Sequence, residues 1–293
     1  MATKNQCFFG LQKTLDKKRT ELNNMKWILL RNSYHYGDQL MTIMFFIQLK
    51  DELKEKNIRI QYRCYEKYHK ELRKWMEVYG LDKIIELVGM EKEEREEDEL
   101  DVWLGNRRII KLKYICVEEW KRFYEKVKKL YDFKTELKFG FPLIKRDLSK
   151  SQFDILICNS FTYSGQATPQ MIVDFDRWIL DFYVKEQEKD EKDRKRIIIT
   201  RPLVTDKGEL IDIPYTSQYG CETLYEIGEM SRECEWVIGF ITGPVMATFW
   251  EDRLKTKRWI LYDANGYQMK HEKIEYIKEW HQFRERIEKL GKR

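Results

Sequence analysis

The sequence predicts an α/β protein built from two Rossmann-like, doubly wound domains that face a central cleft. Strand-like apolar runs alternate with helix-like periodicity along most of its 293 residues. Near each end of the chain, at 27–47 and at 235–250, such a run breaks at a polar turn and restarts as an apolar helix. The length also suits two α/β domains with separate cores.

We expect an N-terminal extension at 1–24, followed by the first domain at 25–142. Its elements alternate in the manner of a parallel sheet with crossover helices. The expected strands lie at 27–30, 58–65, 84–88, 101–104 and 109–115, and the helices begin near 38 and cover 68–79 and 117–133. Gly and Pro at 139–143 interrupt both periodicities and mark the passage between the domains.

The second domain is expected at 150–271. Its strands are predicted at 153–158, 196–201, 236–240 and 259–262, with helices from Pro169, around 224–230 and at 243–250. A last helix is predicted over 272–290, from the apolar spacing between Ile274 and Ile287. We expect this helix to rejoin the first domain.

Composition excludes several classes of protein. Fifty-five Lys and Arg against fifty Asp and Glu leave a net charge of only +5, and both signs are interspersed, which argues against a nucleic-acid partner. The six cysteines form no C-x-x-C pair, so reduced core thiols are expected. No apolar run reaches 18 residues, which predicts a cytoplasmic protein without a transmembrane segment and leaves contact with a membrane surface open.

The first candidate site follows the first strand. Gly37 is expected in a tight turn and Asp38 at the start of a helix, where an N-cap role is one interpretation. The other is that Asp38 is a general base at the carboxyl end of the strand, where open α/β sheets bind their ligands. His35, three residues earlier, is a second candidate contact in catalysis.

The second candidate site is an anion-binding turn at Thr242, Gly243 and Pro244. A strand, a Gly turn and a helix N-terminus together present backbone N–H groups to a phosphate, and Pro fits the first helical position. Arg201, at the end of another strand, is a candidate partner for a diphosphate, with a surface salt bridge as the alternative. The loop 159–165 offers hydroxyl groups at a third strand end, Ser160 first among them.

Motifs of other enzyme classes are absent. The sequence contains no G-x-G-x-x-G after a strand, no P-loop, no G-x-S-x-G and no H-E-x-x-H. Asp174 and Asp176 match the D-x-D of metal-dependent glycosyltransferases, but they fall inside an expected amphipathic helix rather than at a strand end.

The segments 223–230, 234–239, 242–250 and 258–262 resemble, in this order, the donor half of GT-B glycosyltransferases, and most of all the heptosyltransferase-like enzymes. Gly37 and Asp38 before an apolar helix resemble the start of the acceptor half of the same enzymes. The resemblance implies that Asp38 is the catalytic base and that the start of the helix at Gly243 binds the donor diphosphate. In this chain Met246 stands where the family often has His.

The sequence therefore predicts a GT-B-type glycosyltransferase that transfers a sugar from a nucleotide-diphosphate-sugar to a glycan or another hydroxyl acceptor. We expect inversion, no metal and no cofactor, since a helix N-terminus and a basic side chain can stabilise the leaving diphosphate. The donor-binding residues are predicted to be Ser160, Arg201, Thr223, Thr242, Gly243 and Pro244. The alternatives are a metal-dependent GT-A-type transferase and a non-catalytic module that binds glycans or nucleotides.

Overall fold

A computed structural model describes residues 26–32, 36–90, 103–104, 107–111, 128, 131–142, 152–159, 168–250, 258–263 and 273–290. Contacts divide the chain into two compact units, each described by itself. Unit 1 contains the described residues up to 32, from 48 to 111 and from 128 to 135. Unit 2 contains 36–47 and everything described from 136 onwards.

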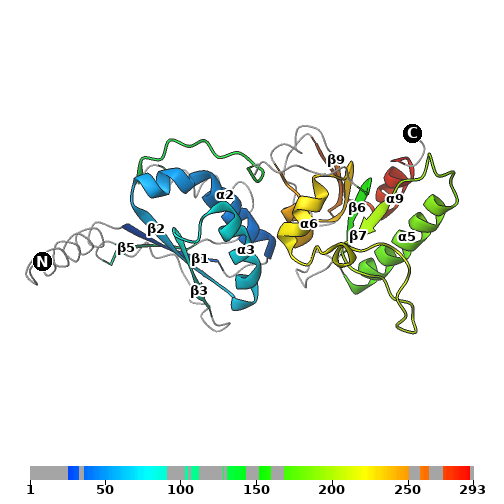
Figure 1. Ribbon diagram of the computed structural model, residues 1–293, viewed down its shortest axis with the longest axis horizontal. Coiled ribbons are helices and arrows are strands. Elements are labelled where there is room, and N and C mark those ends of the chain that lie inside the picture. The colour runs from blue at the N-terminus through cyan, green and yellow to red at the C-terminus, as the bar shows by residue number, and fades with distance from the viewer. Residues whose placement is uncertain are drawn as a thin grey trace, which may run out of the picture. The chain divides into compact units, whose positions relative to one another are not determined.

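Unit 1 contains a five-stranded sheet, sheet 1, in the order β3-β2-β1-β5-β4 (Figure 1). The strands are β1 (Lys26–Arg31), β2 (Ile58–Cys64), β3 (Ile85–Gly89), β4 (Trp103–Leu104) and β5 (Arg107–Lys111). All neighbours pair in parallel except β4 and β5, which form an antiparallel pair. We expected parallel strands throughout, but only two residues separate β4 from β5, and a parallel crossover needs a dozen or more.

The helices of unit 1 follow from their apolar patterns. After η1 (Glu66–Tyr68), α3 (His69–Tyr79) buries Leu72, Trp75, Met76 and Tyr79 on one face, as the spacing predicted. It ends at Gly80, whose φ of 66° is the left-handed conformation that glycine adopts at helix C-termini. Strand β2 alternates between buried and more exposed side chains, with Ile58, Ile60 and Tyr62 among the buried ones.

Helix α2 (Tyr36–Glu55) begins two residues before Asp38, so Gly37 lies inside its first turn. The predicted tight turn at Gly37 and the N-cap interpretation of Asp38 are therefore both wrong. From Gln39 to Ile47 every side chain is buried, including Gln39 and Thr42. A helix that is buried on all sides gives little amphipathic periodicity, which explains why its start was misplaced.

Unit 2 contains a five-stranded, fully parallel sheet, sheet 2, in the order β10-β9-β8-β6-β7. The strands are β6 (Ile155–Cys158), β7 (Ile197–Ile199), β8 (Trp236–Phe240), β9 (Arg258–Tyr262) and β10 (Ile274–Ile277). When these five strands are numbered 1 to 5 in chain order, their order across the sheet is 2-1-3-4-5, one of the two common doubly wound orders. Sheet 2 thus has the doubly wound topology that the strand pattern predicted for this part of the chain.

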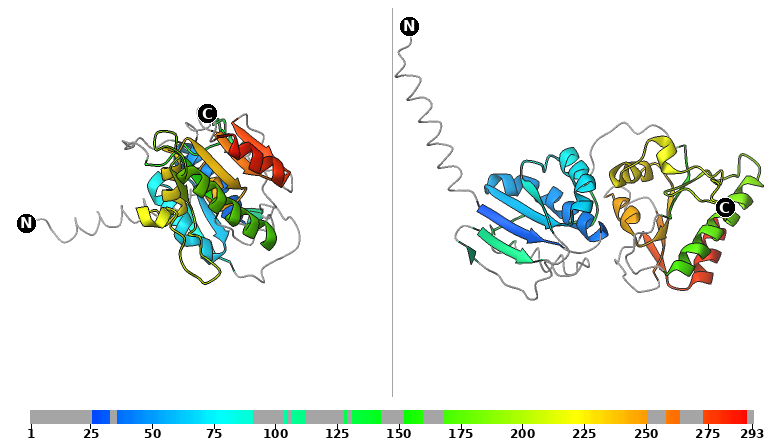
Figure 2. Two further views of the ribbon diagram at one scale, coloured as in Figure 1. Left: turned by 90° about the vertical axis from the view of Figure 1, so that its right-hand side faces the viewer. Right: turned by 90° about the horizontal axis from the view of Figure 1, so that it is seen from below.

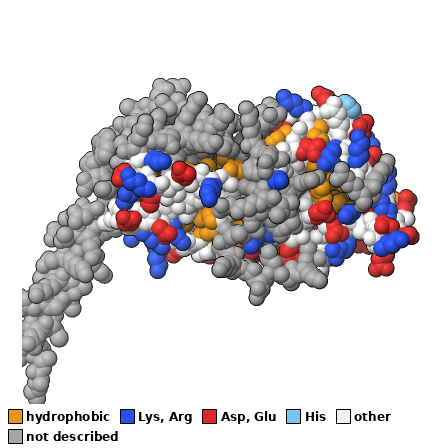
Figure 3. Space-filling model, turned by 90° about the horizontal axis from the view of Figure 1, so that it is seen from above, with side chains coloured by type: hydrophobic (Ala, Val, Ile, Leu, Met, Phe, Trp, Pro, Cys, Tyr) orange, Lys and Arg blue, Asp and Glu red, His pale blue; other side chains and the backbone are white. Residues whose placement is uncertain are grey.

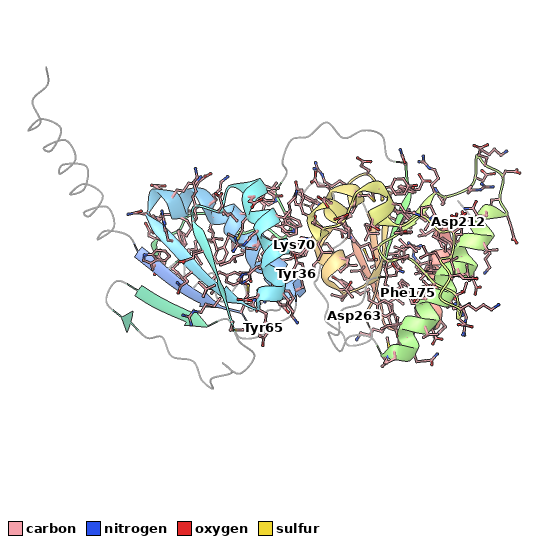
Figure 4. The ribbon with its side chains drawn as sticks, turned by 60° about the horizontal axis from the view of Figure 1, so that its bottom comes forward. Tyr36, Tyr65, Lys70, Phe175, Asp212 and Asp263 are labelled. Carbon is pink, nitrogen blue, oxygen red and sulfur yellow. The ribbon has the colours of Figure 1, made fainter. Side chains whose placement is uncertain are left out.

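The described part of unit 2 contains the N-terminal part of α2 and the helices α5 (Pro169–Gln187), α6 (Leu224–Ser231), α7 (Gly243–Ala247) and α9 (Trp280–Glu288), with η2 (Thr216–Tyr219) as a short 3-10 turn. Helices α5 and α9 lie side by side against sheet 2 (Figure 2). Phe175 points from α5 towards the strands and meets Phe240 of β8 edge to face, with ring centroids 4.9 Å apart (Figure 4). This aromatic layer, with Ile155, Ile238 and Ile260 beneath it, forms the core of unit 2.

The C-terminal segment differs from the prediction in two ways. Residues 274–277 form strand β10, paired with β9, and the helix begins only at Trp280. The segment also belongs to unit 2 and does not rejoin the first domain, because Phe283 and Ile287 are buried in the core of unit 2. Ile274 and Ile277 lie three residues apart, a spacing that also fits a helix. The spacing alone therefore predicted one long helix where the structure has a strand followed by a helix.

Several predictions fall outside the described residues. These are the extension at 1–24, residues 112–115 of the expected strand at 109–115, most of the helix at 117–133, His35, and the loop at 160–165 with Ser160. None of the cysteines in the described ranges, which are Cys64, Cys158, Cys221 and Cys234, forms a disulfide. Burial raises the pKa of Cys64 to about 12 and also raises that of Cys158, so both thiols stay protonated and unreactive at neutral pH.

Charge on the surface is mixed. Figure 3 shows basic and acidic side chains interspersed over the described residues of one face, without a large area of one sign. None of the described helices combines the length and the apolar character needed to cross a membrane.

Candidate functional site

The candidate site lies at the carboxyl edge of sheet 2. Strand order reverses between β6 and β8, because β7 follows β6 on one side and β8 lies on its other side. In open α/β sheets, ligands bind outside the carboxyl ends of the strands at such a switch point. The polar residues that leave these strands are Asn159 after β6, Thr200 and Arg201 after β7, and Thr242 after β8.

Asn159 is fully buried and organises the ends of β6 and β7. Its side-chain Oδ1 accepts a hydrogen bond from the Arg201 N–H at 2.8 Å, and its Nδ2 donates to the Arg201 carbonyl at 2.9 Å. The Thr200 hydroxyl accepts a hydrogen bond from the Asn159 N–H at 3.0 Å and donates to Asn159 Oδ1 at 3.2 Å. The backbone of Arg201 is therefore fixed at the switch point by a side chain that sequence reasoning had left out of the site.

Arg201 forms a salt bridge with Asp176 of α5, with 2.5 Å between Nη2 and Oδ2. Its Nε also donates to the Asn159 carbonyl at 3.3 Å. Burial raises the pKa of Asp176, and the neighbouring Arg201 opposes that rise. The side chain of Arg201 is still 38% exposed, so the salt-bridge interpretation is confirmed while part of the guanidinium stays accessible.

Thr242 follows β8 and stands at the N-cap position of α7. Its side chain caps no backbone N–H, although Thr at this position commonly does. The residue is only 6% exposed, and its Oγ1 has no hydrogen-bond partner among the described residues. A buried hydroxyl without a partner costs free energy, so this atom is suited to bind a polar ligand group.

Gly243 and Pro244 begin α7 as the sequence predicted, but the helix ends at Ala247 and has only five residues. A macrodipole needs aligned peptides over several turns, so α7 contributes its first N–H groups rather than a strong dipole. A Cβ placed on Gly243 would lie 3.2 Å from Tyr36 Cδ1, and one on Gly37 would lie 3.1 Å from Met246 Cγ. These residues all belong to unit 2, whose α7 is thus packed against the first turn of α2.

Asp38 is the next residue on this first turn and is half-buried. Its carbonyl accepts a hydrogen bond from the Thr42 hydroxyl at 2.9 Å, within the helix. Because Gly37 contacts Met246 of α7, the described structure brings Asp38 into the same unit as Thr242 and Gly243.

Thr223 has a structural role. Its Oγ1 accepts the Glu226 N–H at 3.3 Å, and Glu226 Oε2 accepts the Thr223 N–H at 2.9 Å, which makes a capping box at the start of α6. The hydroxyl of Thr223 is therefore used at the start of its own helix. This capping role accounts for Thr223 without any contact to a sugar donor.

Asp174 and Asp176 lie inside α5, as expected, and do not act as a pair. Asp174 accepts a hydrogen bond from the Gln170 side chain at 2.9 Å, one turn away, whereas Asp176 binds Arg201. Among the described residues, no group of three or more His, Cys, Asp or Glu side chains could hold a metal ion.

Two solved structures are similar to this chain over most of its length. One is the glycosyl transferase family 9 structure from Veillonella parvula DSM 2008, with a TM-score of 0.48 and 12% identity over 90% of this chain and 91% of that chain. The other is E. coli heptosyltransferase WaaC with ADP-2-deoxy-2-fluoro heptose, with a TM-score of 0.49 and 10% identity over 91% and 99%. No protein-family model and no curated protein matches the sequence.

Both solved structures are of the enzyme class that the sequence motifs resemble.

Proposed function

We propose that the chain is a glycosyltransferase that moves a sugar from a nucleotide-diphosphate-sugar to a hydroxyl acceptor, with the donor bound by unit 2. One observation carries the proposal. Arg201, Asn159 and Thr242 follow the three adjacent strands β7, β6 and β8 around the switch point of sheet 2. The cation of Arg201 and the buried hydroxyl of Thr242 suit a phosphate-containing ligand, while the amide of Asn159 fixes the backbone of Arg201 beside them.

The leaving group of such a transfer is a nucleoside diphosphate, on which negative charge develops as the sugar–oxygen bond breaks. Donors held in place before the reaction stabilise this charge without reorganisation. The accessible N–H groups of Arg201, the Thr242 hydroxyl and the first N–H groups of α7 are donors of this kind. We therefore propose that transfer needs no metal ion, because these donors stabilise the leaving diphosphate instead.

For Asp38 we propose the role of general base. Its carboxylate would take the proton from the acceptor hydroxyl as that oxygen attacks the anomeric carbon and the diphosphate leaves from the opposite side. A single displacement of this kind inverts the anomeric configuration. Asp38 is half-buried on the first turn of α2, which contacts α7 through Gly37.

A thermal-shift screen of nucleotide sugars, followed by transfer assays with the best donor, tests the proposal. A donor at 100 times its dissociation constant should add about 2.7 kcal/mol of stability. Arg201→Ala should weaken binding of the nucleoside diphosphate about ten- to a hundred-fold and leave binding of the bare nucleoside nearly unchanged. Lys207→Ala, an exposed cation on the same connection, is the matched control.

The outcomes separate the candidate functions. Donor binding without turnover for any acceptor would favour a non-catalytic module with the same fold. Equal diphosphate affinity of the wild type, Arg201→Ala and Thr242→Val would place the donor elsewhere and contradict the proposed site.

A further inference from the structure

We propose that Asp176 is a positioning residue: it holds the guanidinium of Arg201 at the carboxyl edge of sheet 2, in the orientation that the donor's diphosphate requires. The inference rests on the proposed function and adds to it a residue on α5, outside the strand ends. In the sequence, Asp176 stands out only as half of a D-x-D that lies in the wrong element for a metal site.

Arg201 is anchored at three points. The side-chain amide of Asn159 fixes its backbone, the Asn159 carbonyl accepts its Nε–H at 3.3 Å, and Asp176 Oδ2 accepts one Nη2–H at 2.5 Å. In the part of the chain that the structure describes, no acceptor binds the other N–H groups of the guanidinium. The planar fork is thus held from one edge while its other edge can receive an anion.

The anchoring matters because an arginine side chain loses much rotamer freedom when it binds a ligand. A side chain that is already ordered by Asp176 loses less of that freedom on binding, which favours affinity. The two side chains are 38% and 26% exposed, so solvent reaches the pair and a ligand can approach it.

The environment of Asp176 is costly for a purely structural pair. Its Oδ1 is buried and has no hydrogen-bond partner among the described residues, while Oδ2 alone receives Arg201. Leaving a carboxylate oxygen buried in this way is unfavourable, and burial correspondingly raises the pKa of Asp176. A donor site that requires one orientation of the Arg201 side chain explains why the ion pair is kept despite this cost.

The proposal makes a prediction opposite to that of simple electrostatics. Asp176 and a diphosphate are both negative, so by charge alone Asp176→Asn should strengthen the binding of an anion near Arg201. If Asp176 acts by positioning Arg201, the same substitution should weaken it.

Calorimetric titration of pyrophosphate, a nucleoside diphosphate and the bare nucleoside into a set of variants decides between these effects. The set contains wild type, Asp176→Asn, Asp176→Glu, Arg201→Ala, the double variant Asp176→Asn/Arg201→Ala, and Asp174→Asn as the control on the same helix. Both Asp176 variants should bind pyrophosphate about tenfold more weakly, with the nucleoside unaffected, and the double variant should be no weaker than Arg201→Ala alone. Asp174→Asn should match the wild type.

Unchanged or tighter pyrophosphate binding in Asp176→Asn would overturn the inference and leave the proposed function intact. Equal weakening by Asp176→Asn with and without Arg201 would also overturn it, because the effect would not pass through Arg201. A wild type that binds neither pyrophosphate nor any nucleoside diphosphate would overturn both proposals. Asp176→Glu keeps the charge but displaces the carboxylate, so it serves as the test if Asp176→Asn does not fold.

Discussion

The side-chain amide of Asn159 binds both backbone groups of Arg201, at 2.8 Å to its N–H and 2.9 Å to its carbonyl. The Asn159 side chain takes the place of one more strand residue. Its two hydrogen bonds continue the pairing of β6 and β7 past the last ladder residues, Ile157 and Ile199. The arrangement fixes the loop after β7 beside the switch point, where we propose that Arg201 binds the donor diphosphate.

Replacing Asn159 should therefore affect stability and binding together. Asn159→Ala removes the partners of the part-buried N–H and carbonyl of Arg201, which should cost about 2–4 kcal/mol. Asn159→Asp keeps an acceptor for the N–H, but it buries a carboxylate and turns one of its oxygens towards the Arg201 carbonyl, so its cost should be at least as large. Urea denaturation measures both, with the exposed Gln170→Ala as control. A loss for Asn159→Asp much smaller than that for Asn159→Ala would mean that the bond to the Arg201 carbonyl contributes little.

Asp38→Asn should abolish transfer and leave the fold and donor affinity nearly unchanged. The substitution removes the proton acceptor, while the Thr42 hydroxyl still bonds to the backbone carbonyl of residue 38. Turnover measured with saturating donor checks the outcome, and donor titration supplies the control. A turnover within about threefold of wild type would end the catalytic assignment of Asp38.

Transfer should continue in the presence of a chelator, because Asp176 is occupied by Arg201 and Asp174 by Gln170. Initial rates are measured with and without EDTA, and Mg²⁺ or Mn²⁺ is then added back. Activity that disappears with EDTA and returns with the metal would favour the metal-dependent alternative.

The strand–helix alternation was predictable from sequence because periodicity reports burial directly. Ile58, Ile60 and Tyr62 alternate with exposed residues, and Phe175, Trp178 and Phe182 return at helical spacing, and the structure places all of them in the cores. Arg201, Thr242 and Gly243 could be named as candidates from the sequence because each lies just after a predicted strand, and open α/β sheets bind ligands at strand ends.

What the sequence did not reveal depends on contacts between distant residues. Asp176 joins the site from the middle of α5, 25 positions before Arg201, and no local pattern identifies its partner. The start of α2 was misplaced because Gly37 suggests a turn, whereas in the structure it lets the helix approach Met246. Ile274 and Ile277 fitted a helix until pairing with β9 made them a strand.

Two glycines in unit 2 should differ sharply when replaced by alanine. A Cβ on Gly228 would lie 2.5 Å from the backbone carbonyl oxygen of Ala247, where α6 packs against α7, whereas one on Gly243 would lie 3.2 Å from the Tyr36 ring. The backbone of Ala247 can move only at a large cost in free energy, whereas the Tyr36 ring can shift. Gly228→Ala should therefore lower the free energy of unfolding by about 3 kcal/mol, and Gly243→Ala should lower it by about 1 kcal/mol or less. Thermal unfolding of both variants ranks them, and a larger loss for Gly243→Ala would contradict the packing of α7.

In unit 1, Glu52 of α2 holds the segment at 134–135. Its carboxylate accepts the backbone N–H groups of Lys134 at 2.8 Å and Thr135 at 2.6 Å, and also the Thr135 hydroxyl. Burial acts to raise the pKa of Glu52, but the hydrogen bonds from Thr135 and Lys134 outweigh it, so the pKa lies below its ordinary value of 4.5. Folding therefore favours the ionised form.

Glu52→Gln should lower the free energy of unfolding by about 1–2 kcal/mol at pH 7, because an amide accepts these bonds less strongly than a carboxylate. The sign of the pH dependence follows from the lowered pKa: the contribution of Glu52 is complete above its unfolded value and is lost as pH falls through the folded value. The difference between wild type and variant should thus shrink below about pH 4.5. Denaturant titrations between pH 3 and pH 7 measure it, with the exposed neighbour Asp51→Asn as control. A difference that stays constant down to pH 3 would mean that side-chain shape, rather than the charge of Glu52, holds the segment to α2.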